Sequence, residues 1–161
     1  MVRKMKSLSN FVVKNLIKKN IKIAFAESCT GGLLSATITS NPGSSKVLDC
    51  GLVVYSNKSK NKLLKIPPKK IKKYGAVSEQ ICLEMLKSIS KISKSNISIS
   101  ITGIAGPNGG TKEKPVGLVY VGIKRGNKTI IKKYLFKNQS RSYIQKNTVN
   151  KCLRLILSLL K

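Results

Sequence analysis

The residues best suited to chemistry lie in one short stretch, IAFAESCTGG, at positions 23–32. An apolar run ends there in Glu27 and Ser28, and glycines follow at Gly31 and Gly32. A serine at such a strand-to-helix turn lies near the unpaired N–H groups of the next helix, and those donors can stabilise an oxyanion. Taken alone, the stretch favours a plain helix cap, because it matches neither the G-x-S-x-G elbow nor a phosphate-binding P-loop.

The base for a nucleophilic serine cannot be an imidazole here, because the chain contains no histidine. For the same reason we exclude zinc sites built from thiolate and imidazole, and we predict no metal site. The remaining candidate is a lysine whose pKa falls well below its usual value of about 10.4. The stretch YSNKSK (55–60) offers one, because Lys60 would lie in the first turn of a short helix, where the helix dipole, Lys58 and partial burial oppose its charge. Tyr55, which ends the preceding strand, is placed to hold Lys60 or to relay a proton, although any one lysine of 28 is usually a solvated surface residue.

A third candidate segment is the glycine-rich loop TGIAGPNGG (102–110), which continues into TKEKPVG (111–117). Four glycines in nine residues can turn several N–H groups toward an anion. An irregular connection that needs glycine for its turns explains the same pattern. Two of the five acidic residues, Glu27 and Glu113, fall inside these candidate loops, where they are suited to bind ribose hydroxyls or to pair with a lysine.

The elements that must position these motifs follow from hydrophobic periodicity and turn signals. The predicted strands cover 21–27, 46–56, 96–106, 116–125 and 128–137, and the predicted helices cover 5–19, 30–39, 57–64, 78–93 and 140–160. The segment 67–75 is expected to be a surface connection. Strands alternate with helices until one terminal hairpin at Gly126-Asn127, which predicts a three-layer α/β/α sandwich with a mostly parallel five-stranded sheet and one antiparallel strand. Ligands bind at the carboxyl ends of the strands in such sheets, so the three motifs should meet at one rim.

Length and composition set further limits. The 161 residues fit a single domain over 1–161. No apolar run approaches the ~18 residues of a membrane span, and the basic start lacks a small-residue cleavage site, so we expect a cytoplasmic protein without a membrane partner. The four cysteines lie far apart and are expected to be reduced thiols.

The net charge of +27 raises the question of nucleic acid. Of the 32 basic residues, 28 are lysines spread over every segment and only four are arginines, and aromatic residues make up 5% of the chain. Nucleic-acid recognition favours arginine and stacking aromatics. We therefore interpret the charge as solvated lysine faces that attract anionic ligands in general, and we do not expect nucleic acid as the partner.

The motifs together resemble one family. AESCTGG, the GSS of NPGSS, GLVVYSNKSK, YGAVSE, TGIAGPNGG and TKEKPVG occur in this order between residues 26 and 117. This ordered set resembles the CinA C-terminal domain family, whose members include nicotinamide-nucleotide amidases, and the chain resembles its standalone form. The resemblance implies hydrolysis of the carboxamide of nicotinamide mononucleotide to nicotinate mononucleotide and ammonia, with a nucleotide as the small-molecule partner and without a metal or organic cofactor. It also implies a homo-oligomer.

Carried over position by position, the resemblance makes Ser28 the nucleophile, Lys60 the general base and Tyr55 a catalytic residue beside it. The residues expected to bind the substrate, some from the resemblance and some from their place in the loops, are Glu27, Thr30, Gly31, Thr102, Gly103, Asn108, Gly109, Gly110 and Glu113. One departure from the family pattern is Lys58-Ser59, where members often have an acidic residue and alanine.

Two other functional interpretations remain open from the sequence. The charge, with the family's link to competence and damage, fits a nucleic-acid-associated protein without amidase activity. An inactive relative that keeps only the fold is the other alternative, although the motif residues are intact.

Overall fold

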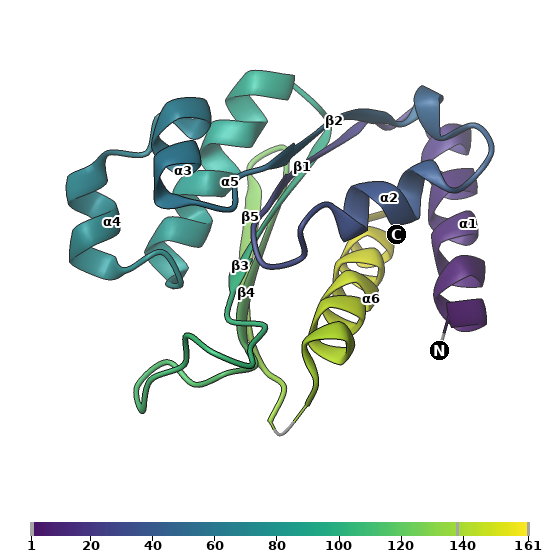
Figure 1. Cartoon of the computed structure of the whole chain (residues 1–161). Coiled ribbons are helices and arrows are strands. Elements are labelled where there is room, and N and C mark those ends of the chain that lie inside the picture. The colour runs from purple at the N-terminus through teal and green to yellow at the C-terminus, as the bar shows by residue number, and fades with distance from the viewer. Residues whose placement is uncertain (1, 138, 161) are drawn as a thin grey trace.

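A computed structural model describes residues 2–137 and 139–160, with side chains from residue 5 onward. Its strands are β1 (Ile23–Glu27), β2 (Leu48–Val53), β3 (Ile97–Gly103), β4 (Leu118–Arg125) and β5 (Lys128–Leu135). Its helices are α1 (Val2–Lys18), α2 (Leu33–Thr39), α3 (Asn57–Leu64), α4 (Pro68–Tyr74), α5 (Glu79–Ser93) and α6 (Arg141–Leu160), with a 3-10 turn η1 (Ser44–Lys46). Figure 1 shows the sheet between two helical layers, with α1, α2 and α6 on one face and α3, α4 and α5 on the other.

The sheet has the order β2-β1-β3-β4-β5. β1 is parallel to both β2 and β3, and the β3–β4 and β4–β5 pairs are antiparallel, so that β4 alone runs against the other strands. The predicted three-layer sandwich with one antiparallel strand is therefore confirmed.

The central strands β1 and β3 are buried on both faces; the apolar run predicts this for β1, whereas β3 alternates isoleucine with small hydroxyl residues that are buried as well. All five residues of β1 are buried. Ile23 and Phe25 pack in the core beneath α1, α2 and α6, whereas Ala24 and Ala26 pack beneath α3, α4 and α5. Two helical layers thus hold β1 in place, and β1 carries the candidate serine at its carboxyl end.

Helix α4 corrects the prediction that residues 67–75 form a surface connection. Pro68 occupies the first turn of this helix, where its missing N–H costs nothing and its fixed φ suits the helix. Ile71, only 6% exposed, anchors α4 in the core of the α5 layer. The proline pair therefore starts a helix here instead of only ending the one before it.

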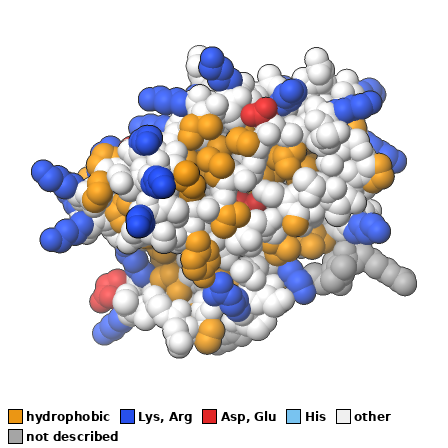
Figure 2. Space-filling model, turned by 45° about the horizontal axis from the view of Figure 1, so that its top comes forward, with side chains coloured by type: hydrophobic (Ala, Val, Ile, Leu, Met, Phe, Trp, Pro, Cys, Tyr) orange, Lys and Arg blue, Asp and Glu red, His pale blue; other side chains and the backbone are white. Residues whose placement is uncertain are grey.

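The described helices include none that is long and apolar enough to cross a membrane. The four cysteines are free thiols, and Cys50 alone among them is partly exposed. On the face shown in Figure 2, Lys and Arg side chains lie mostly toward the margins, while hydrophobic side chains gather across the middle.

Candidate active site

Ser28 and Lys60 meet at the carboxyl ends of the strands. Ser28 directly follows β1, and its N–H donates to the Ile101 carbonyl at 3.0 Å. Lys60 lies in α3, which follows β2, and its Nζ donates to the Ser28 Oγ at 3.0 Å. A hydroxyl and an amine that are 32 residues apart in the chain are thus in direct hydrogen-bond contact.

The start of α3 explains why Lys60 reaches this position. Ser56 is the N-cap: its side chain accepts from the Ser59 N–H at 3.0 Å, and the Ser59 hydroxyl accepts from the Ser56 N–H at 3.1 Å. This reciprocal pair fixes the first turn. The predicted helix over 57–64 is confirmed, and its first turn directs Lys60 inward while Lys58 remains exposed.

The Lys60 amine is enclosed by neutral groups. Lys60 is 1% exposed, and its Nζ also donates to the carbonyls of Val54 at 2.7 Å and Tyr55 at 3.3 Å. Burial lowers the pKa of this amine from about 10.5 to about 8. Because Lys58 is exposed, burial rather than a neighbouring cation is the main reason that part of the Lys60 amine is neutral near physiological pH.

Cys29, the neighbour of Ser28, is not a competing nucleophile. It is 5% exposed, and burial raises the pKa of its thiol to about 12. The thiolate is the reactive form of cysteine, so this thiol stays protonated and inert.

Glu27 has a structural role that the sequence analysis did not assign to it. One carboxylate oxygen accepts from the Thr30 hydroxyl at 2.7 Å and the Leu34 N–H at 3.0 Å, and the other accepts from the Ser35 N–H at 2.8 Å and hydroxyl at 2.7 Å. Glu27 is fully buried. It therefore ties β1 to the positive N-terminus of α2, where a carboxylate is favoured.

This arrangement corrects the expected oxyanion site. The first N–H groups of α2 are engaged by Glu27 or by the turn before the helix, since Leu33 donates to the Thr30 carbonyl at 3.1 Å. Gly31 and Gly32, with φ of 59° and 93°, delay the start of α2 to Leu33 instead of Thr30. An oxyanion at this site would therefore need donors other than the N–H groups of Leu33, Leu34 and Ser35.

The glycine-rich loop closes the site from the β3 side. A cavity of about 240 Å³ lies between the three segments, and the residues that line it are Ser28, Cys29, Tyr55, Lys60, Ala76, Val77, Thr102, Gly103, Ile104, Ala105, Gly106, Asn108, Gly109 and Arg141. Of the predicted binding residues, Thr102, Gly103, Asn108 and Gly109 belong to this lining. Thr102 also donates its hydroxyl to the Ala76 carbonyl at 2.8 Å, which fixes the wall between α4 and α5.

The other predicted binding residues lie outside this lining. Glu27 and Thr30 bond to each other in the interior, and Gly31 belongs to the turn before α2. Gly110 packs against Val116, and the exposed Glu113 accepts from the Thr111 hydroxyl at 3.0 Å within the loop.

Arg141 is the main residue that the sequence analysis missed. It begins α6, donates from Nη2 to the Tyr55 hydroxyl at 2.9 Å, and donates from Nη1 to the Gly106 carbonyl at 2.9 Å. The hydroxyl of Tyr55 thus bonds to Arg141, whereas Tyr55 reaches Lys60 through its backbone carbonyl. The one signal in the sequence was residue type, since arginine occurs only four times in the chain.

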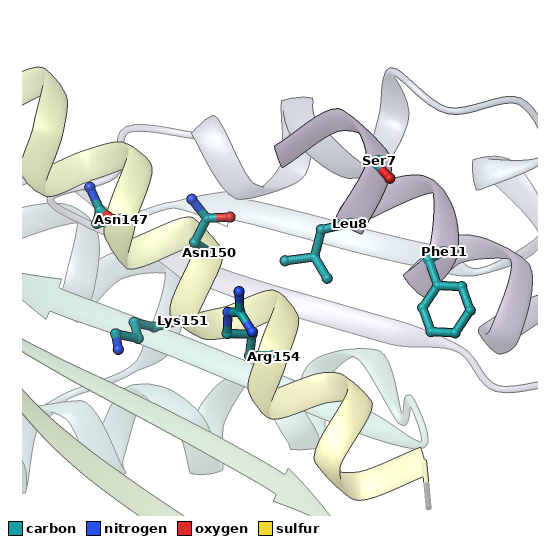
Figure 3. Close-up of a pocket in the computed structure, with 7 residues that line it drawn as sticks. All are labelled: Ser7, Leu8, Phe11, Asn147, Asn150, Lys151 and Arg154. Atoms are coloured by element: carbon teal, nitrogen blue, oxygen red, sulfur yellow. The ribbon is translucent and has the colours of Figure 1, made fainter. Parts of the chain in front are cut away.

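A larger hollow of about 770 Å³ lies elsewhere, between α1 and α6 (Figure 3). Ser7, Leu8 and Phe11 form one wall, and Asn147, Asn150, Lys151 and Arg154 form the other. Ser7 and Lys151 point away from one another in this view. The hollow therefore lacks the pairing of hydroxyl and amine that marks the smaller cavity.

Comparison with known proteins shows which family the chain belongs to. The sequence model of the CinA C-terminal domain matches residues 5–160. The chain belongs to the CinA C-terminal domain family. A CinA-like protein of Prochlorococcus marinus (strain MIT 9515) is 50% identical over 94% of this chain, and another from strain MIT 9312 is 51% identical over the same share. The chain spans 36% and 37% of those relatives, little more than a third of their length.

Solved structures of CinA proteins have the same fold. The competence/damage inducible protein CihA from Agrobacterium tumefaciens superposes with a TM-score of 0.94 at 34% identity, covering 98% of this chain and 96% of that one. A CinA superfamily protein from Klebsiella pneumoniae 700603 gives 0.91 at 26% identity, covering 97% of each chain. The CinA resemblance read from the ordered motifs is thereby confirmed.

Proposed function

We propose that this chain is an amidase that hydrolyses the carboxamide of nicotinamide mononucleotide to nicotinate mononucleotide and ammonia. The observation that carries the proposal is the buried contact of 3.0 Å between Lys60 Nζ and Ser28 Oγ, with the pKa of the amine lowered to about 8. An amine that is partly neutral near physiological pH can take a proton from a serine hydroxyl, which activates the oxygen as a nucleophile. Membership of the CinA C-terminal domain family supports the same assignment.

The reaction follows from these two groups. Ser28 Oγ attacks the carboxamide carbon while the neutral Lys60 amine accepts the hydroxyl proton. Collapse of the tetrahedral intermediate breaks the C–N bond, and the Lys60 ammonium returns the proton to the departing nitrogen, which leaves as ammonia. Water then attacks the acyl-serine ester, with Lys60 accepting its proton and returning it to Ser28, so that the carboxylic acid is released. No cofactor takes part in these steps.

The cavity also suits the shape and charge of this substrate. A volume of about 240 Å³ accommodates the ring that carries the carboxamide, with the ribose phosphate at the open rim. At that rim Arg141 contributes a cation and Asn108 and Gly109 contribute polar groups of the loop. The net charge of +27 adds a general attraction for the phosphate.

The test is ammonia release from nicotinamide mononucleotide by purified protein. We expect turnover by the wild type, none detectable from Ser28→Ala, and a loss of about 10²–10⁴-fold in Lys60→Ala, the usual contribution of a general base. Lys62→Ala, an exposed lysine of the same helix, is the matched control and should keep wild-type turnover. No release from folded wild-type protein would reject the amidase, whereas undiminished release from both site variants would reject the mechanism alone.

A nucleic-acid-associated protein without amidase activity is the second candidate, and the net charge of +27 is the observation in its favour. It predicts tight DNA binding that weakens steeply with salt, without ammonia release. Measuring both properties on one preparation separates the two functions.

A further inference from the structure

A glutamine of α6 holds the turn that follows the candidate nucleophile. Within this turn the Ser28 carbonyl accepts from the Gly31 N–H at 3.0 Å. The next carbonyl, that of Cys29, accepts from Nε2 of Gln145 at 2.9 Å, across 116 residues of sequence. A peptide group is planar, so fixing its carbonyl also fixes the N–H of the following residue. Gln145 therefore sets the orientation of the second peptide group after Ser28.

The same helix reaches all three segments that form the cavity. Gln145 lies one turn after Arg141, and residues four apart lie on the same face of a helix. Arg141 contacts the segment after β2 and the glycine-rich loop. Gln145 contacts the remaining segment, the turn after β1. The first two turns of α6 thus join the three parts of the candidate site.

The core fixes the part of α6 from which Gln145 reaches this turn. Its neighbour Ile144 is fully buried in the core beneath α1, α2 and α6, as is Val149 one turn later, whereas Gln145 itself is half-buried. The apolar face of the helix accounts for these two buried neighbours, but a half-buried position at its border requires no hydrogen-bond donor. The contact with Cys29 gives the amide at this position a specific role.

We infer that Gln145 is a positioning residue for the proposed amidase: through the Cys29 carbonyl, it holds Ser28 where the Lys60 amine can take the hydroxyl proton. This role rests on the proposed function. The Lys60 amine is also held by two backbone carbonyls on the β2 side, which Gln145 does not contact. Losing Gln145 should therefore displace the hydroxyl relative to a fixed amine, and a displacement of about 1 Å costs on the order of 10²-fold in rate.

The kinetic effect should separate this role from substrate binding. Gln145 lies outside the cavity lining, so Gln145→Met, which removes the amide donor but keeps the length of the side chain, should lower kcat by about 10–100-fold and change KM by less than about twofold. The Lys60 amine stays buried in this variant, so kcat/KM should still level off near pH 8. Asn150→Leu is the matched control, because it replaces a half-buried amide of α6 that lines the hollow beside α1. It should keep the wild-type kcat.

Thiol labelling provides a second readout that needs no turnover. Cys29 is only 5% exposed, and its carbonyl is the group that Gln145 holds. In a Cys50→Ser background, which removes the partly exposed thiol, Gln145→Met should let iodoacetamide reach Cys29 at least about tenfold faster, because the turn opens locally. Cys82, fully buried in α5, should react as slowly as in the parent protein and so reports on general loosening of the fold. Peptide mass spectrometry assigns each label.

The two readouts separate failure of this role from failure of the amidase. Faster labelling of Cys29 alone supports the hold of Gln145 on the turn even if the wild type releases no ammonia, since that result rejects the proposed function. An active enzyme in which Gln145→Met leaves kcat unchanged, or raises KM at constant kcat, would overturn the positioning role. Labelling of Cys29 that stays slow, or that accelerates together with that of Cys82, would overturn it as well.

Discussion

At Lys60, a cation is buried among neutral acceptors. Its Nζ donates to the Ser28 hydroxyl and to two backbone carbonyls, and no carboxylate forms an ion pair with it within the described part of the chain. Three acceptors fix the position of the amine, while the lack of a counter-ion keeps its charged form costly. The arrangement thus combines a fixed position with a lowered proton affinity, which is what a general base requires.

The first prediction concerns the pH dependence of the proposed reaction. Because the free enzyme needs the neutral amine and the pKa of Lys60 is about 8, kcat/KM should rise about tenfold per pH unit below pH 8 and level off above it. Initial rates of ammonia release between pH 6 and 10 measure this profile. A profile that is flat from pH 6 to pH 8 would show that Lys60 is not the titrating base.

The second prediction concerns stability. An unfolded lysine has a pKa of about 10.4, whereas that of Lys60 in the fold is about 8, so between these pH values the unfolded chain binds the additional proton. The contribution of Lys60 to the free energy of unfolding is therefore least favourable below pH 8 and improves as pH rises toward 10. In urea denaturation, the free energy of unfolding of the wild type should increase relative to that of Lys60→Met as pH rises from 8 to 10.

The control for this experiment is Lys62→Met, an exposed lysine of α3. The difference in free energy of unfolding between Lys62→Met and the wild type should remain nearly constant with pH. Equal pH dependence of the two variants would mean that the buried amine has no special proton affinity.

The third prediction joins Tyr55 and Arg141. The bond of 2.9 Å from Arg141 to the Tyr55 hydroxyl links the start of α6 to the segment after β2, and Arg141 also holds the glycine-rich loop at Gly106. Tyr55→Phe and Arg141→Gln should each lower kcat/KM. Expressed as transition-state stabilisation, the loss in the double variant should be smaller than the sum of the two single losses by about 0.5–3 kcal/mol. Strict additivity would show that the contact does not matter for turnover.

At the scale of elements, Glu27 has a role that its position in the sequence does not indicate. Glu27 reads as a pocket carboxylate because it directly precedes the candidate serine, yet its four acceptor contacts all face α2. It links the strand that carries Ser28 to the helix that follows. The position of the nucleophile thus depends on a carboxylate that does not line the cavity.

The fourth prediction tests this anchor. In Glu27→Gln an amide –NH₂ replaces one acceptor oxygen and faces backbone and hydroxyl donors, so donors oppose donors in the interior. We expect the free energy of unfolding to fall by about 1.5–3 kcal/mol, the usual value for hydrogen bonds to a charged group. Glu113→Gln, in the exposed loop, should change it by less than about 0.5 kcal/mol. Similar urea midpoints for the two variants would contradict the anchoring role.

What the sequence predicts well are features set by local physics. An apolar run predicts β1, turn signals predict the short helix α3, and the carboxyl-end rule predicts that Ser28 and Lys60 approach each other. Contacts between distant segments are harder to predict. Arg141 reaches Tyr55 from 86 residues away, and α4 depends on the burial of one isoleucine, Ile71, beside a proline pair that also reads as a helix end. Neither contact leaves a periodic pattern in the sequence.

At the scale of the whole molecule, charge is poorly balanced. Against 32 basic residues the chain has five acidic ones, and within the described residues only two ion pairs form, both to Glu84, at 3.0 Å from Lys70 and 3.7 Å from Lys87. Glu27 is committed to hydrogen bonds in the interior. Little favourable pairing therefore offsets the mutual repulsion of the lysines, and this repulsion opposes the compact state.

The last prediction follows from this imbalance. Salt screens repulsion among exposed charges over about 10 Å at 0.1 M, whereas the two exposed ion pairs contribute at most about 1 kcal/mol each. Raising sodium chloride from 10 to 500 mM should therefore increase the melting temperature by several degrees, measured by circular dichroism at low protein concentration to limit association. Sucrose at matched osmolality separates screening from surface exclusion, because it leaves charge interactions unchanged. A melting temperature that stays constant or falls with salt would show that the lysines are too far apart to repel one another.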